Sequence, residues 1–306
     1  MLHLYDPRFQ EVANTAGALQ RLCYGAIWSE GPVWMHEDDS LLWSDIPNNR
    51  MLRWHAQDGM TVWRAKADFC NGHTREADGA LLHCSHGLRA IVRTRFGADL
   101  SQLTDEIVVD NYQGRRLNSP NDIVVKSDGT LWFTDPPYGI LSDYEGYKAV
   151  SELGVCYVFR FDPANGSMRI VSDLIEEPNG LAFSPDESTL YISDTSAALR
   201  TDGSGNHHIM AFDVVGGQDL AAPRVFATID KGLSDGFRLD GHGFLYTSCA
   251  EGVQVFHPDG SKMALIAVPE KVGNLTFGGK QRDILFICAS QSLYSIRLNT
   301  KGLQCP

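Results

Sequence analysis

Several features that would place the chain in other classes of protein are missing from it. No apolar run approaches the roughly 20 residues that a membrane-spanning helix needs. The segment Met1–Gln10 contains no apolar stretch of the kind found in secretory signals. Cysteine occurs seven times, an odd number with no C-x-x-C pair, so we expect reduced thiols. Together these absences predict a cytoplasmic protein that has no membrane partner.

Positive charge is also scarce. Lys and Arg number 26 against 38 Asp and Glu, which gives a net charge of −12. Because an acidic surface repels phosphate backbones, nucleic acid is not expected as a partner. The G-x-S-x-G motif of serine esterases and the glycine-rich loops that cradle phosphates are absent as well.

One short segment recurs six times along the chain. A length of 306 residues by itself predicts either two domains or one large closed fold. Each copy of the segment is a mostly apolar run that ends in small or polar residues, which is typical of a strand buried on both faces. The copies are Leu41–Asp45, Leu81–Ser85, Leu131–Asp135, Leu190–Asp194, Leu245–Cys249 and Leu285–Ala289.

Turn signals and a second strand accompany these segments. Clusters of Asp, Gly and Pro precede most copies, an alternating strand follows each one, and long helical periodicity is missing. The unit is therefore a four-stranded antiparallel meander, which is typical of a β-propeller blade. We predict an all-β fold in which residues 1–306 form a single domain, a six-bladed β-propeller. A double β-sandwich is the alternative, but it does not require such even repeats.

The two ends of the chain predict how the propeller closes. The last repeat supplies strands at 272–278, 284–289 and 292–298, followed only by Lys301–Pro306, so it lacks an outer strand. A spare segment around Leu19–Gly25 precedes the first repeat. We expect this N-terminal segment to complete the last blade, which leaves no open strand edge.

A carboxylate or carboxamide stands at the start of the first strand of every repeat, 10 or 11 residues before the recurring segment. These six residues, called the polar ring below, are Glu30, Asn71, Asn121, Asn179, Asp235 and Asn274. The first strand of each blade lines the central channel, so the six side chains are expected to converge at one end of the axis. Taken singly, an Asn or Asp before Gly is an ordinary turn former. Six of them in register favour a functional role.

The side chains of the polar ring all offer oxygen atoms. Two carboxylates balance a divalent cation, and four amides add ligands without adding charge. That oxygen set suits a hard ion, with Ca²⁺ first and Mg²⁺ or Mn²⁺ behind it. Zn²⁺ stays possible, although it usually prefers His or Cys ligands and the polar ring has neither. One divalent metal ion is therefore the predicted cofactor.

Motifs spread over nearly the whole chain carry a family resemblance. They are Glu30-Gly31-Pro32-Val33-Trp34, Ser119-Pro120-Asn121-Asp122, Glu177–Asp186 and Asp235-Gly236. With these motifs the chain resembles the gluconolactonase, senescence-marker-protein and luciferin-regenerating-enzyme family, and Leu42–Asn48 and Phe133–Gly139 resemble its bacterial gluconolactonase branch. The resemblance implies a six-bladed propeller with one catalytic divalent metal in the channel. It implies Glu30, Asn179 and Asp235 as metal ligands, and Asn121 as a further ligand or a substrate contact.

The chain departs from the family pattern at three places. Animal members carry Arg where this chain has Ser119, and their acidic substrate contact aligns near Tyr138. Bacterial relatives often have Glu-His-Gly where this chain has Ser85-His86-Gly87. These differences leave the sugar specificity open and make Tyr138 a candidate substrate contact.

The predicted chemistry is the attack of water on a lactone carbonyl. A divalent ion stabilises the developing oxyanion, but Ca²⁺ acidifies water only weakly, so a positioned base would help. The resemblance places Asp235 at the metal, and Asp235 is the predicted catalytic base. His86 and Arg75 are candidate contacts for sugar hydroxyls, with turn packing and solvated surface charge as the alternatives. Three acids that end recurring segments are interpreted mainly as structural acceptors between blades: Asp45, Asp135 and Asp194.

Three functions are compatible with these residues. The leading hypothesis is a metal-dependent hydrolase that opens lactones of the gluconolactone type to aldonic acids, with a small-molecule lactone as its partner. A promiscuous phosphotriesterase or aryl-ester hydrolase could use the same metal site. A non-catalytic propeller that acts as a binding module is the third reading. Monomer and homodimer are both left open.

Overall fold

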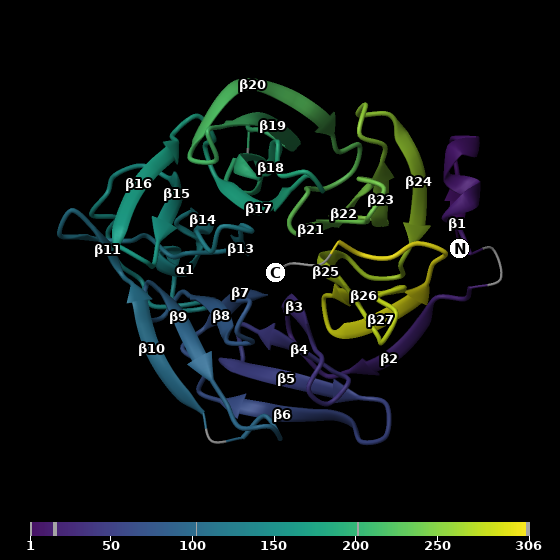
Figure 1. Ribbon diagram of the computed structural model, residues 1–306, viewed down its shortest axis with the longest axis horizontal. Helices are drawn as coiled ribbons and strands as arrows, with labels where there is room; N and C mark the ends of the chain where they lie inside the picture. The colour runs from purple at the N-terminus through teal and green to yellow at the C-terminus, as the bar shows by residue number, and fades with distance from the viewer. Residues whose placement is uncertain (1, 15–16, 102, 201, 304–306) are drawn as a thin grey trace.

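The computed structural model confirms the predicted architecture. It describes residues 2–14, 17–101, 103–200 and 202–303, and nearly all of its regular structure is β-strand. Six antiparallel sheets surround a central axis, and the innermost strand of each faces the channel (Figure 1). The chain is therefore a six-bladed β-propeller of four-stranded blades. Within the described residues, no helix has both the length and the apolar content needed to cross a bilayer.

The first five blades are built from four strands that follow one another in sequence, from the channel outwards. The first three blades are β3–β6 (Ser29–Met35, Ser40–Asp45, Arg50–His55, Gly59–Ala65), β7–β10 (Cys70–Arg75, Leu81–Ser85, Ala90–Arg95, Thr104–Val109) and β13–β16 (Ile123–Val125, Leu131–Asp135, Tyr157–Asp162, Ser167–Ser172). The next two are β17–β20 (Pro178–Phe183, Thr189–Asp194, His208–Val215, Asp219–Thr228) and β21–β24 (Phe237–Leu239, Leu245–Cys249, Gly252–Phe256, Lys262–Ala267). The sixth blade consists of β25–β27 (Val272–Gly278, Ile284–Ala289, Ser292–Arg297) and β2 (Gln20–Tyr24).

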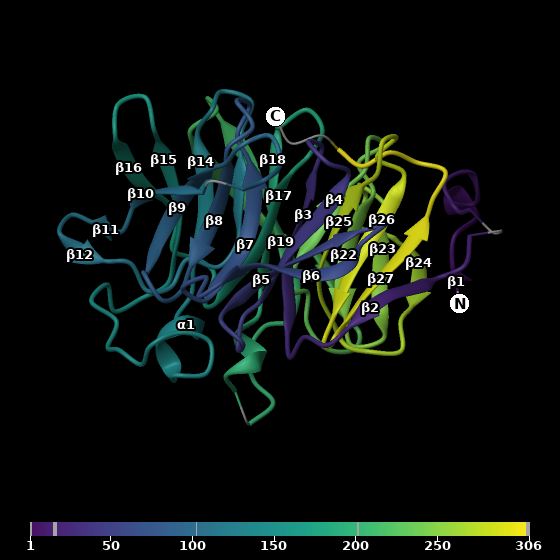
Figure 2. The same cartoon turned by 90° about the horizontal axis from the view of Figure 1, so that it is seen from below.

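A few elements lie outside this repeat. Strand β1 (Leu2–Leu4) adds a fifth strand to the outer edge of the fifth blade, which the sequence did not predict. A small hairpin, β11 and β12 (Asn111–Tyr112, Arg115–Arg116), follows the second blade. Short helices are η1 (Pro7–Glu11), α1 (Tyr138–Leu141) and η2 (Ser196–Ala198). The segment around α1 projects from one end of the propeller (Figure 2).

The recurring segments form the second strand of every blade, as predicted. They are buried along their length because each blade packs its two faces against its neighbours. Trp43 and Trp132 are among the largest fully buried side chains. Between the sixth and first blades, the Trp34 and Phe286 rings stack with centroids 5.3 Å apart.

The N-terminal segment closes the propeller, as predicted. Strand β2 pairs antiparallel with β27, from Gln20 opposite Ser295 to Tyr24 opposite Ser292, and forms the outer strand of the sixth blade. The described C-terminal residues instead run back toward the channel, where the Leu303 amide donates to the Leu239 carbonyl at 3.0 Å. Residues 304–306, the last part of the tail, lie outside the described residues.

Removing β2 should therefore weaken the whole protein. We expect deletion of residues 1–25 to lower Tm by about 10 °C or more, since several strand hydrogen bonds and edge protection are lost. Deletion of residues 1–5 is the control, because it removes β1 but keeps β2 and the buried Phe9. Thermal unfolding and light scattering would compare the two, and equal Tm values would contradict the closure role of β2.

Candidate functional site

The polar ring sits at one end of the channel, as the repeat predicts. Its members lie at or just before the start of the six innermost strands. Five of them line a cavity of about 290 Å³, called the site cavity below: Glu30, Asn71, Asn121, Asn179 and Asp235. The sixth, Asn274, is buried behind the cavity, where its Nδ2 donates to Glu30 Oε2 at 3.0 Å.

Irregular strand pairing aims these side chains at the axis. The register between the first and second strands shifts just after Glu30, around Asn71 and around Asn179. Such bulges turn a side chain away from its normal alternation. Gly31 makes the close packing possible, because its φ is 53° and a Cβ there would lie 2.0 Å from the Asn71 carbonyl oxygen.

Hydroxyl groups at the end of the recurring segments hold the polar ring in place. Thr134 Oγ1 donates to the Asn179 carbonyl at 2.8 Å, and Ser44 Oγ donates to the Asn71 carbonyl at 2.9 Å. In both pairs the hydroxyl belongs to one blade and the carbonyl to the next. In these two segments the hydroxyl near the end of the strand thus fixes the backbone of the ring residue in the next blade.

The Glu30 carboxylate is buried and incompletely paired. Its Oε2 accepts from the Gly31 amide at 2.8 Å and from Asn274, whereas Oε1 has no hydrogen-bond partner. Burial raises the pKa of Glu30 well above the ordinary value of 4.5, and the Asp235 carboxylate raises it further. A buried anionic oxygen without a partner is costly, and a cation in the site cavity would offset that cost.

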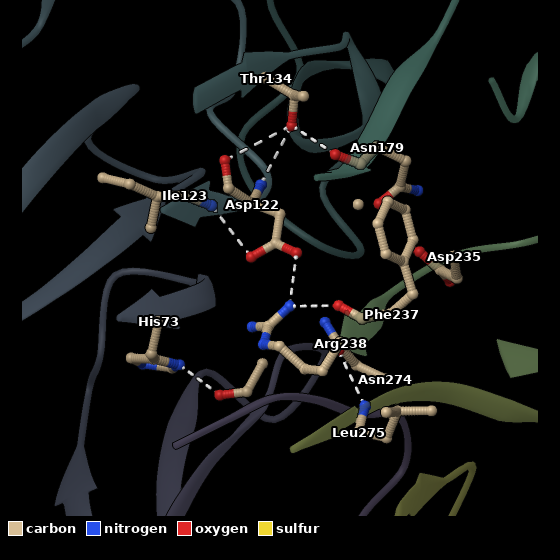
Figure 3. A network of polar contacts seen from close by, with 12 residues as sticks. His73, Asp122, Ile123, Thr134, Asn179, Asp235, Phe237, Arg238, Asn274 and Leu275 are labelled. Atoms are coloured by element: carbon tan, nitrogen blue, oxygen red, sulfur yellow. Dashed lines mark hydrogen bonds and ion pairs between the residues drawn. The ribbon is translucent and has the colours of Figure 1, made fainter. Parts of the chain in front are cut away.

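The second carboxylate, Asp235, faces the same space. Burial raises its pKa to about 6, while Lys271 and a hydrogen bond from Asn179 lower it. Its backbone amide donates to Ser248 Oγ at 2.8 Å, which fixes the segment before β21. Figure 3 shows Asn179 and Asp235 side by side at the wall of the channel.

An ion pair closes the channel below the polar ring. Asp122 Oδ2 and Arg238 Nη1 lie 3.4 Å apart, and Asp122 is almost fully buried (Figure 3). Arg238 follows Asp235 by three residues and lines the cavities at the other end of the propeller. The pair therefore forms a floor that separates the site cavity from those at the far end.

Two of the predicted substrate contacts reach the site cavity. Asn121 and Tyr138 both line it, and Tyr138 Oη lies 2.6 Å from Thr195 Oγ1. Tyr138 is the first residue of α1, so it overhangs the polar ring from the projecting segment. Burial raises the pKa of Tyr138, which keeps its hydroxyl protonated.

The other two predicted substrate contacts do not line the site cavity. His86 is 1% exposed and lies behind Asn71, with its Nε2 3.3 Å from Asn71 Nδ2. Arg75 lies in the cavity of about 330 Å³ at the far end, paired with Glu37 at 2.5 Å. Four residues along an extended strand separate Arg75 from Asn71, a span of about 13 Å. The expectation that Arg75 contacts sugar hydroxyls in the site cavity is therefore wrong.

The acids that end recurring segments accept hydrogen bonds from the connections that lead from the preceding blade into their own. Asp45 Oδ1 accepts from the Ile27 amide at 2.8 Å, and Asp135 Oδ2 accepts from the Asn118 amide at 2.8 Å. Asp194 likewise accepts from the Glu176 amide at 3.2 Å. Each carboxylate thereby anchors the segment that leads into the polar-ring residue of its blade.

Further lining residues were missed by sequence reasoning. Three of them precede a ring residue by two or three positions, a regularity that could have identified them: Trp28, Leu233 and Lys271. Glu145 and Thr195 come from irregular connections and carry no comparable signal. Lys271 Nζ lies 5.2 Å from the centre of the Trp28 ring, so a cation and an aromatic face stand together at the cavity.

The side chains present fit a divalent cation. Glu30 and Asp235 supply two negative charges, Asn121 and Asn179 supply neutral oxygens, and Glu30 Oε1 is left without a partner. No group of three or more His, Cys, Asp or Glu side chains is placed to hold a metal within the described part of the chain. A metal here would therefore depend on amide oxygens, which favours a hard ion over Zn²⁺.

Known proteins resemble this chain in sequence and in fold. Residues 28–291 match the family model described as SMP-30/Gluconolactonase/LRE-like region. The gluconolactonase of Zymomonas mobilis is 31% identical, with 97% of this chain and 86% of that protein covered. A solved gluconolactonase from Xanthomonas campestris has a TM-score of 0.88 and 37% identity, with 97% of this chain and 94% of that chain covered. A calcium-binding regucalcin from Agrobacterium tumefaciens shares the fold at 20% identity and a TM-score of 0.75, with 95% and 97% of the two chains covered.

Proposed function

Because the chain belongs to the SMP-30/gluconolactonase/LRE-like family, we propose that it is a lactonase that opens sugar lactones with the help of one divalent metal ion. The observation that supports a metal ion is a pair of carboxylates, Glu30 and Asp235, that face one cavity. Within it, Glu30 Oε1 has no hydrogen-bond partner. The Zymomonas and Xanthomonas gluconolactonases support a lactone as the substrate. Ca²⁺ is the first candidate ion, since the available donors are all oxygens.

The residues of the site cavity have separate roles in lactone opening. A bound divalent ion would polarise the lactone carbonyl and stabilise the oxyanion that forms on it. Glu30 and Asn179 would hold the ion, and Asn121 would orient the substrate carbonyl. Asp235 would contribute a carboxylate oxygen to the ion, accept the proton of the attacking water, and return that proton to the ring oxygen as the acyl C–O bond breaks. Tyr138 overhangs the cavity from α1 and contacts the sugar.

Chelation tests the metal requirement directly. We expect EDTA to reduce hydrolysis of glucono-δ-lactone to the background rate, and added Ca²⁺, Mg²⁺ or Mn²⁺ to restore it. Proton release recorded with a pH indicator gives the rate, and the metal-free protein is checked for folding by circular dichroism. Full activity of a folded, metal-free protein would overturn the metal mechanism.

A substrate panel separates the competing activities. Glucono-δ-lactone and other aldonolactones should be hydrolysed faster than dihydrocoumarin or an aryl phosphotriester. A preference for the phosphotriester would favour the phosphotriesterase reading. Inactivity on the entire panel with metal bound would favour a binding module.

A further inference from the structure

His86 joins two walls of the site cavity without lining it. Its Nδ1 lies 2.9 Å from the Glu145 carbonyl oxygen, and its Nε2 lies 3.3 Å from Asn71 Nδ2. Asn71 belongs to β7, whereas Glu145 lies in the long connection that follows α1. One buried imidazole therefore bridges a ring residue and the loop that overhangs the cavity.

The chemistry of these contacts sets the tautomer of His86. A backbone carbonyl can only accept, so Nδ1 must carry the hydrogen that is donated to Glu145. The imidazole has no carboxylate partner in the described residues and is buried, which lowers its pKa to about 4 and keeps it neutral. Its Nε2 is then a bare acceptor, and Asn71 must present its amide NH₂ to it. The Asn71 Oδ1 is left as the amide atom on the side of the cavity.

The Glu145 side chain turns toward the cavity while its carbonyl faces His86. Glu145 lines the cavity, and its pKa is raised to about 7, mainly by burial and also by the Asp235 carboxylate, with Lys271 acting in the opposite direction. The carboxyl thus shares the cavity with both groups. Gly139 lets the loop pack on His86, since a Cβ at that position would lie 2.4 Å from the His86 Cβ. The loop therefore packs directly against the histidine.

We propose that Asn71 Oδ1 and the Glu145 carboxyl group form a hydroxyl-binding wall that selects polyhydroxylated lactones over apolar ones, and that His86 is the positioning residue that holds both. Sugar hydroxyls donate to these oxygens, whereas an apolar lactone leaves them without a partner in a partly desolvated site. The inference rests on the proposed lactonase function, because it names the substrate class of the same cavity. His86 is thus a positioning residue and does not contact the substrate.

Kinetics on one polyhydroxylated lactone and one apolar lactone test the hydroxyl-binding wall. We expect Glu145→Ala to lower kcat/KM for glucono-δ-lactone roughly 10- to 100-fold, mostly through KM, and to change kcat/KM for dihydrocoumarin less than about twofold. His86→Phe should likewise lower kcat/KM for glucono-δ-lactone more than kcat/KM for dihydrocoumarin. Glu11→Ala, which changes an exposed glutamate of η1 that does not line the site cavity, is the control of the same residue type and should leave both rates unchanged. Equal losses of kcat/KM on both substrates would show that these residues only support the structure, and would overturn the proposal.

Two further measurements test the proposal without relying on lactone turnover. Long-range ¹H–¹⁵N correlation spectra of the imidazole should show the Nδ1–H form of His86 at neutral pH, and an Nε2–H form would refute the assigned Asn71 orientation. Binding of D-glucitol, a polyol without a lactone, should weaken in Glu145→Ala even if the wild-type protein hydrolyses no lactone. Unchanged glucitol binding would defeat the wall, whereas an inactive wild-type protein would defeat only the proposed function.

Discussion

Asp235→Asn is expected to lower kcat/KM for glucono-δ-lactone by roughly 10³-fold or more, because it removes a proton acceptor and one of two charges facing the cation. The asparagine keeps the shape and the Asn179 contact of the native side chain, so the fold should survive. Its amide cannot accept the proton of the attacking water. Burial has raised the pKa of Asp235 to about 6, which brings its basicity closer to neutrality than that of an ordinary carboxylate.

The measurement combines turnover with metal content. Initial rates of proton release give kcat/KM, and calorimetric titration with Ca²⁺ shows whether loss of rate follows loss of metal. If metal is retained at saturating Ca²⁺ and the rate still falls, Asp235 acts as a base in addition to a ligand. Asp230→Asn, an exposed acid five residues earlier, is the control for mutation of the same residue type. Wild-type rates in Asp235→Asn would refute the catalytic assignment.

The propeller and its polar ring were predictable because both repeat. Every copy of the recurring segment has the same two features: an apolar run that must be buried on both faces, and an ending of small or polar residues. The structure gives the polar ending a physical meaning that spacing alone could not supply. Thr134 Oγ1 fixes the carbonyl of Asn179 in the next blade, while Asp135 anchors the segment leading to its own ring residue.

The rest of the site cavity does not repeat and so could not be predicted from the sequence in the same way. Glu145 lies in the irregular connection between β14 and β15, and only the folded structure shows that it lines the site cavity. Arg75 was placed at the site because it is close to Asn71 in sequence. An extended strand carries it to the opposite end of the channel within four residues. Proximity in sequence is a poor guide to a site that lies at strand ends.

Glu30→Gln is expected to change stability in opposite directions with and without metal. In the metal-free wild-type protein, a buried carboxylate with an unpartnered Oε1 faces a second carboxylate. The glutamine oxygen can still accept from Gly31 and Asn274, but the charge is gone. We expect metal-free Glu30→Gln to be more stable by about 2 kcal/mol, or roughly 4 °C in Tm. The gain in Tm that saturating Ca²⁺ gives the wild-type protein should be largely lost, together with most lactone turnover.

The same carboxylates set the pH dependence of the metal-free protein. The pKa values of Glu30 and Asp235 are raised in the folded state, from ordinary values of 4.5 and 3.8, so the folded protein holds these protons to higher pH than the unfolded chain does. Their contribution to stability is therefore complete below pH 3.8 and is lost as pH rises past 6. Glu30→Gln should make stability fall less steeply as pH rises. The control Glu152→Gln, at an exposed surface acid, should leave this pH dependence unchanged. Thermal unfolding between pH 5 and 8 in EDTA gives both slopes, and parallel curves for wild-type and Glu30→Gln would show that Glu30 carries no uncompensated charge.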